Sequence, residues 1–127
     1  MNRVGAWVVL GLVWTVTGVA AAHEEHATNA AGEQTLTGEV VDVFCYLSHG
    51  KEGLGKDHAG CAKKCIESGL PVAFRVGNQL YLATLATHDP ANKTLAAFAG
   101  EQVTVHGHIF ESDGQHLIAV TKVEKAK

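Results

Sequence analysis

Methionine and tryptophan occur only near the start of this chain. Both tryptophans (Trp7 and Trp14) and the single methionine (Met1) lie within the first 22 of 127 residues. If that segment is removed, no methionine remains, which excludes a copper or haem site with a methionine ligand. Basic residues are also few, with ten Lys and Arg against 13 Asp and Glu and a formal net charge of −3. Nucleic-acid binding depends on a basic surface, so we expect no nucleic-acid partner.

Several reactive motifs are missing as well. The cysteines do not form a C-x-x-C-H sequence, so covalent haem is not indicated. Cys61 and Cys65 have the spacing C-x-x-x-C, which differs from the C-x-x-C of thioredoxins. A cysteine assisted by His58 could act as a nucleophile, but no third orienting group and no acyl- or phosphate-handling motif accompanies it. We therefore expect a protein that is not an enzyme.

The first 22 residues have the layout of a secretory signal peptide. A positive start (Met1-Asn2-Arg3) precedes an uncharged apolar run, and Ala20-Ala21-Ala22 supplies a small-residue cleavage site. We expect cleavage before His23 and a periplasmic or secreted mature protein. The alternative is a retained anchor, since about 17 to 19 apolar residues can just span a bilayer. In that case the protein would remain at the membrane.

The rest of the chain divides into a short tether and one domain. Residues 23–34 have no apolar periodicity and predict a flexible, histidine-containing tether. Residues 35–127 predict a single domain of five strands with two helical insertions. The strands are expected at 35–47, 72–76, 79–85, 101–110 and 115–124. The first helix is expected at 58–68, between Asp57 as N-cap and Gly69 as C′ residue, and a short second helix at 94–99.

This order of elements is that of an OB-fold barrel. The segments TLTGEVVDVFCY (35–46) and GEQVTVHGHIFESDGQHLIAVTKVE (100–124) resemble the first strand and the last hairpin of small OB-fold-like domains in exported bacterial proteins. The resemblance covers about residues 35–124. It implies a mainly β protein, a five-stranded barrel with a helix between strands one and two and a short helix between strands three and four. It implies no particular function, because this fold serves many.

The most informative residues lie in the first long connection. Cys45 is followed by the sequence His58-x-x-Cys61-x-x-x-Cys65, whose spacings of three and four place the last three side chains on one stripe of a helix. Cys45, His58, Cys61 and Cys65 form a Cys₃His set that suits Zn²⁺, or Cu⁺ with fewer ligands. His49 competes with His58 for the imidazole position. The sequence thus predicts one zinc or copper ion per chain, held by a metal-binding module that acts in metal handling or as a small subunit of a redox assembly.

Disulfide formation is the main alternative for these thiols. An exported protein is exposed to oxidising conditions, and Cys45 could pair with Cys61 or with Cys65 to fasten the helix to the barrel. A Cys61–Cys65 bond across one helical turn would be strained and reducible. Three cysteines leave one thiol unpaired in every case. The protein would then be an interaction domain with a structural or redox disulfide.

Other histidines are weaker candidates. Cleavage before His23 would place a free α-amino group beside its imidazole, a chelate suited to Cu²⁺, with His26 close by. His106 and His108 alternate along one strand face, where a solvated surface is the simpler interpretation. For the metal module we also expect a protein partner in the periplasm.

Overall fold

The computed structural model describes residues 28–29 and 32–127. The expected signal peptide, residues 1–22, lies outside these residues. Most of the expected tether does too, although β1 (Thr28–Asn29) within it pairs with β5. Among the described residues, no helix has the length and apolarity needed to cross a membrane.

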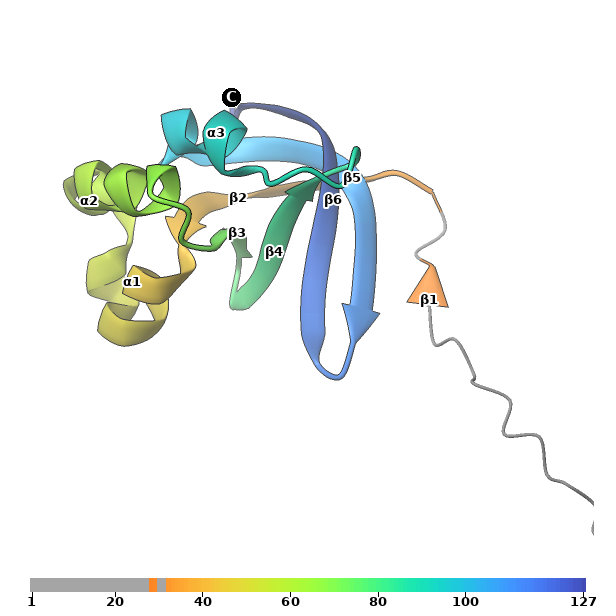
Figure 1. The fold of residues 1–127 in the computed structure, drawn as a ribbon, viewed down its shortest axis with the longest axis horizontal. Coiled ribbons are helices and arrows are strands. Elements are labelled where there is room, and N and C mark those ends of the chain that lie inside the picture. The colour runs from red at the N-terminus through yellow and green to blue at the C-terminus, as the bar shows by residue number, and fades with distance from the viewer. Residues whose placement is uncertain (1–27, 30–31) are drawn as a thin grey trace, which may run out of the picture.

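The predicted barrel is confirmed. Five strands close into a ring in the order β2-β3-β4-β6-β5, with β5 returning to β2 (Figure 1). All neighbours are antiparallel except β4 and β6, which run parallel. This closed, mixed barrel is compatible with an OB-like fold. Its strands are β2 (Gln34–Asp42), β3 (Val72–Val76), β4 (Gln79–Leu85), β5 (Gln102–Ser112) and β6 (Gln115–Lys125).

The helices also occupy the two expected connections. Between β2 and β3 lie α1 (Val43–His49), the 3₁₀ turn η1 (Gly50–Gly53) and α2 (Gly55–Glu67). Between β4 and β5 lie α3 (Asn92–Leu95) and the 3₁₀ turn η2 (Ala96–Phe98). Figure 1 shows α1 and α2 together at one end of the barrel.

The predicted end of the first strand is wrong. The run after Gly38 is rich in β-branched and aromatic residues, which favoured a strand as far as Leu47. The strand ends instead at Asp42, whose carboxylate accepts a hydrogen bond of 2.6 Å from the backbone N–H of Cys45. Asp42 is thereby the N-cap of α1 and turns the chain from strand to helix.

The predicted start of the helix at 58–68 is also wrong. The corresponding helix α2 begins at Gly55, three residues earlier, and the expected N-cap Asp57 lies in its first turn. The backbone N–H of Gly55 donates to the carboxylate of Glu39 on β2 at 2.5 Å, so a residue far away in sequence satisfies this helix end. The C-terminus agrees with the prediction: Gly69 has φ +99°, and hydrogen bonds from Gly69 to Ile66 and from Leu70 to Cys65 complete a Schellman motif.

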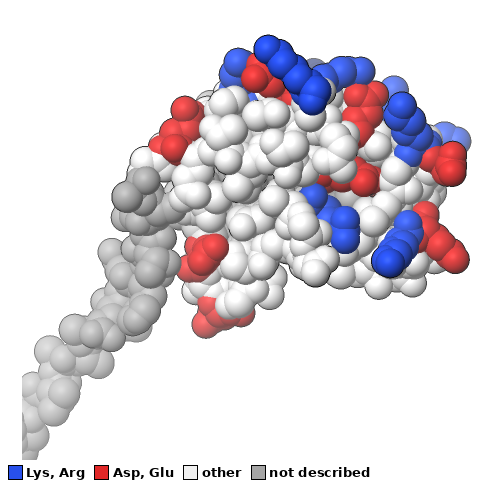
Figure 2. Space-filling view, turned by 180° about the vertical axis from the view of Figure 1, so that it is seen from behind, with Lys and Arg blue, Asp and Glu red and all other residues white. Residues whose placement is uncertain are grey.

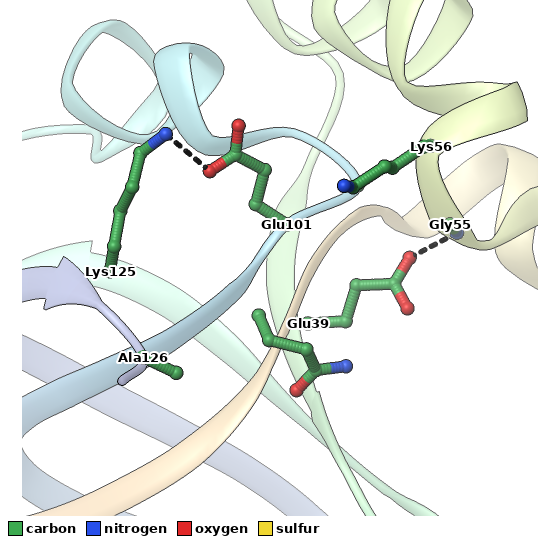
Figure 3. A pocket seen from close by; sticks show the side chains of 8 residues that line it. Glu39, Gly55, Lys56, Glu101, Lys125 and Ala126 are labelled. Atoms are coloured by element: carbon green, nitrogen blue, oxygen red, sulfur yellow. Dashed lines mark hydrogen bonds and ion pairs between the residues drawn. The ribbon is translucent and has the colours of Figure 1, made fainter.

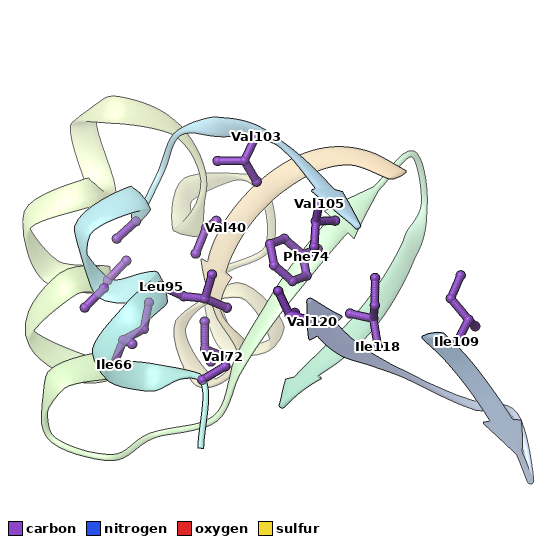
Figure 4. Close-up of a cluster of buried hydrophobic side chains, with 14 residues drawn as sticks. Val40, Ile66, Val72, Phe74, Leu95, Val103, Val105, Ile109, Ile118 and Val120 are labelled. Atoms are coloured by element: carbon purple, nitrogen blue, oxygen red, sulfur yellow. The ribbon is translucent and has the colours of Figure 1, made fainter. Parts of the chain in front are cut away.

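One hydrophobic core joins the barrel to α2 (Figure 4). Alternate residues of β5 point inward, with Val103 and Val105 fully buried. From α2, Ala62 and Ile66 enter the same core at 2% and 0% exposure. The side of α2 that carries Lys63 and Lys64 faces water, so the core determines which way the helix is turned.

Candidate metal centre

Three cysteines from two helices meet at the end of the barrel. Cys45 lies in the first turn of α1, and Cys61 and Cys65 lie one turn apart on α2. Their sulfur atoms all lie within 4.8 Å of one another. We call these three residues the Cys₃ cluster. No disulfide joins them, and all three thiols are free.

The three cysteines of the cluster range from buried to exposed, which we call the burial gradient. Cys45 is buried at 5% exposure, Cys65 is half-buried, and Cys61 is exposed. Gly53 of η1 packs so closely on Cys45 that a Cβ atom at this glycine would lie 2.8 Å from the Cys45 carbonyl oxygen. The inner thiol is therefore fixed by packed backbone, while the outer thiol is open to solvent.

The sulfur separations suit a thiophilic metal ion. A tetrahedral zinc ion with Zn–S bonds of about 2.3 Å places its sulfur ligands roughly 3.8 Å apart. The Cys₃ cluster falls within 4.8 Å, so small side-chain adjustments would close it around an ion. The cluster can also form a disulfide if two of its sulfur atoms approach to about 2.0 Å.

Burial and a neighbouring carboxylate keep the inner thiols protonated in the metal-free protein. Burial raises the pKa of Cys45 to about 12, and the adjacent Asp42 carboxylate is the second cause. Burial is also the largest cause that raises the pKa of Cys65. Metal binding must therefore displace protons from these two thiols.

Asp42 lies at the site although the sequence pattern did not predict it there. Its side chain is 0% exposed, and its Oδ1 atom accepts the hydrogen bond from Cys45 that caps α1. Its Oδ2 atom is buried and has no hydrogen-bond partner among the described residues. An acidic residue inside the apolar run VVDVF was the available signal.

Neither His58 nor His49 contributes a ring nitrogen to the group of ligand atoms that the three sulfur atoms form. His58 lies one turn before Cys61 on α2 and is half-buried, and its Nε2 atom is buried without a hydrogen-bond partner among the described residues. Its ring nitrogens are not part of the group of ligand atoms within 4.8 Å of one another. His49 ends α1 and is exposed, also outside that group. His23 and His26 lie outside the described residues.

Histidines on the barrel have other contacts. His106 bonds through Nδ1 to Thr35 Oγ1 at 2.9 Å, and His116 bonds through Nδ1 to Glu111 Oε1 at 2.8 Å. The His116 ring also packs on Tyr81, with ring centroids 5.4 Å apart. These contacts indicate structural roles, and His106 is a suitable control position for metal-binding experiments.

A separate pocket of about 470 Å³ lies beside the start of α2 (Figure 3). Glu39 lines it and bonds to Gly55, while Lys125 pairs with Glu101 at 2.9 Å across it. Glu39, Glu101 and Lys125 thus have partners within the fold. Lys and Arg also lie among Asp and Glu around a broad uncharged area on the face shown in Figure 2, so this face has no patch of a single charge sign.

Comparison with protein-family models, with curated proteins and with solved structures finds no match to this chain. The fold and the candidate site are therefore the basis for describing the class of this protein. It is a closed β-barrel with a helical insertion that carries three adjacent cysteines able to bind a metal ion.

The burial of the thiols predicts their order of alkylation. In reduced, metal-free protein at pH 8, iodoacetamide is expected to modify Cys61 first and Cys45 last, because only thiolates react and Cys45 is buried. With a pKa of about 12, roughly one Cys45 thiol in ten thousand is ionised at pH 8. Its alkylation rate should then rise about tenfold for each pH unit up to pH 11. Peptide mass spectrometry of timed samples measures each rate.

Urea-unfolded protein is the control for this experiment, since its three thiols should react at similar rates. Equal reactivity of Cys45 and Cys61 in the folded protein would contradict the burial gradient.

Proposed function

We propose that this protein is an exported metal-binding module that holds one zinc or copper ion through Cys45, Cys61 and Cys65. The observation that carries the proposal is the meeting of three free sulfur atoms, from two helices, within 4.8 Å. Thiolates are the ligands that zinc and Cu⁺ prefer, and an exported chain with three neighbouring free thiols suits capture of such ions. The signal-like residues 1–22 support the periplasmic or secreted location.

His58 is the proposed fourth ligand. Its buried Nε2 atom has no partner among the described residues, and it shares a helix with Cys61 and Cys65. Metal binding by His58 would require its ring to turn toward the cysteines that follow it on the same helix. The resulting Cys₃His set is common in structural zinc sites.

Metal handling is the activity that the burial gradient supports best. An ion bound to buried Cys45 and exposed Cys61 is anchored on one side and accessible on the other. A periplasmic partner protein could exchange ligands with the ion from the Cys61 side. The chain would then store or deliver the ion, alone or as a small subunit of a redox assembly.

Elemental analysis of the tag-free mature protein tests the proposal. Protein purified from the periplasm without chelator is expected to carry about one equivalent of zinc or copper, measured by mass spectrometry. Cys61→Ser and Cys65→Ser should each remove most of the metal, because each deletes a ligand. His106→Ala should retain it, since His106 lies on the barrel and bonds to Thr35.

Metal-free wild-type protein with two thiols joined would refute metal binding and favour the disulfide-stapled interaction domain. Loss of the metal from His106→Ala alone would show that the ion is held elsewhere.

A further inference from the structure

Asp42 is the unusual group beside the Cys₃ cluster. It ends β2 and caps α1, but the cap uses one carboxylate oxygen, Oδ1. The other oxygen, Oδ2, is buried without a hydrogen-bond partner among the described residues, in a side chain of 0% exposure. Apart from this cap and the thiol of Cys45, which interacts with this carboxylate, nothing among the described residues compensates its buried charge.

The charge of Asp42 acts on the Cys₃ cluster. The carboxylate lies 2.6 Å from the backbone nitrogen of Cys45, in the first turn of the helix that carries this thiol, and its charge also acts on Cys65 of α2. Any ion held by these thiols therefore lies in the field of a buried negative charge that is not a member of the Cys₃ cluster itself. Such a field is weakly screened, because the carboxylate is out of contact with water.

From this geometry we infer that Asp42 shifts the preference of the Cys₃ cluster toward a doubly charged thiophilic ion, such as Zn²⁺, and away from Cu⁺. The inference rests on the proposed metal binding and adds that the site favours an ion with two positive charges over an ion with one. The attraction between Asp42 and the bound ion is proportional to the charge of the ion, so Zn²⁺ gains about twice as much from it as Cu⁺.

Proton release does not alter this argument. When Zn²⁺ and Cu⁺ are bound by the same thiolates, the repulsion between Asp42 and these thiolates is the same for both ions. The common contribution cancels when the two affinities are compared as a ratio. The effect of Asp42 on this ratio is therefore its interaction with the one additional positive charge that Zn²⁺ carries relative to Cu⁺.

The substitution Asp42→Asn tests the inference. Asparagine is as good an N-cap as aspartate and has the same shape, so α1 is expected to form as before while the charge is lost. The affinities of the reduced protein for Zn²⁺ and for Cu⁺ are measured separately by competition with chelators of known affinity. The ratio of the two dissociation constants is expected to move toward Cu⁺ by about tenfold or more, which is the effect of 1.4 kcal/mol or more.

Glu39→Gln is the matched control. Glu39 lies on the same strand, is also buried at 7% exposure, and accepts from the first residue of α2. Its carboxylate binds Gly55 at the start of α2 and makes no hydrogen bond to Cys45, Cys61 or Cys65. Its substitution should therefore leave the Zn²⁺-to-Cu⁺ ratio within about twofold of wild type, whatever it does to stability.

The outcomes separate the two proposals. A wild-type protein that binds both ions and an Asp42→Asn protein with an unchanged ratio would overturn the role of Asp42 and leave metal binding intact. A wild-type protein that binds neither ion would overturn both. If Asp42→Asn does not fold, Asp42→Ser keeps a capping hydroxyl without the charge, and the same shift in the ratio is required of it.

Discussion

Addition of Zn²⁺ to the reduced, metal-free protein is expected to raise its free energy of unfolding by about 4 kcal/mol when free zinc is a thousandfold above the dissociation constant. The ion would join Cys45 on α1 to Cys61 and Cys65 on α2, and unfolding would separate these ligands. For a domain of about 100 residues, this corresponds to a rise in Tm of roughly 15 °C or more. Thermal unfolding followed by circular dichroism at increasing zinc concentrations measures it.

The control is the double variant Cys61→Ser/Cys65→Ser, which keeps the buried Cys45 but removes both ligands of α2. Zinc should change its Tm by no more than a few degrees. An equal rise in the double variant and in wild type would place the stabilising ion outside the Cys₃ cluster.

The barrel could be predicted because its signals are local. The alternation of Val103, Val105 and Ile109 places these residues inside, and each is at most 6% exposed. The pair Gly77-Asn78 correctly separates β3 from β4. Each of these features depends on residues within a few positions of one another, which is the range that a single sequence reveals.

The path from β2 to α2 depends on contacts that the sequence does not display. Strand propensity favoured residues 43–47 as strand, but the Asp42 cap begins a helix there. The N-terminus of α2 is satisfied by Glu39, 16 positions earlier. Neither Asp42 nor Glu39 could be assigned to a helix end without knowing how β2 approaches the two helices.

The grouping of the three cysteines could be predicted from the sequence, but their surroundings could not. The spacing of Cys61 and Cys65 places them on one face of a helix, and the structure brings Cys45 to them. The burial of Cys45 and the unpaired oxygen of Asp42 arise only when α1 and η1 pack at the end of the barrel. The position of His58 relative to the sulfur atoms likewise depends on its ring orientation, which spacing does not determine.

The position of α2 links the barrel to the Cys₃ cluster. One side of this helix places Ile66 in the core at 0% exposure, and another side carries Cys61 and Cys65. The last turn is also fixed by Asn92, whose Nδ2 atom donates to the carbonyl oxygens of Ile66 and Leu70 at 2.9 Å and 2.7 Å. The meeting of the three sulfur atoms thus depends on how firmly α2 is docked on the barrel.

Replacement of Ile66 by alanine is therefore expected to lower the free energy of unfolding of the metal-free protein by about 2–4 kcal/mol. Alanine is the best helix former, so the loss comes from the cavity left in the core cluster to which Val72 and Leu95 also belong. Lys63→Ala is the control on the exposed side of the same helix, where loss of a 3.9 Å ion pair with Glu67 should change stability by less than about 0.5 kcal/mol. Urea unfolding measures both variants. A loss below about 1 kcal/mol for Ile66→Ala would mean that α2 is not firmly docked in solution, and Cys61 and Cys65 would then not be held beside Cys45.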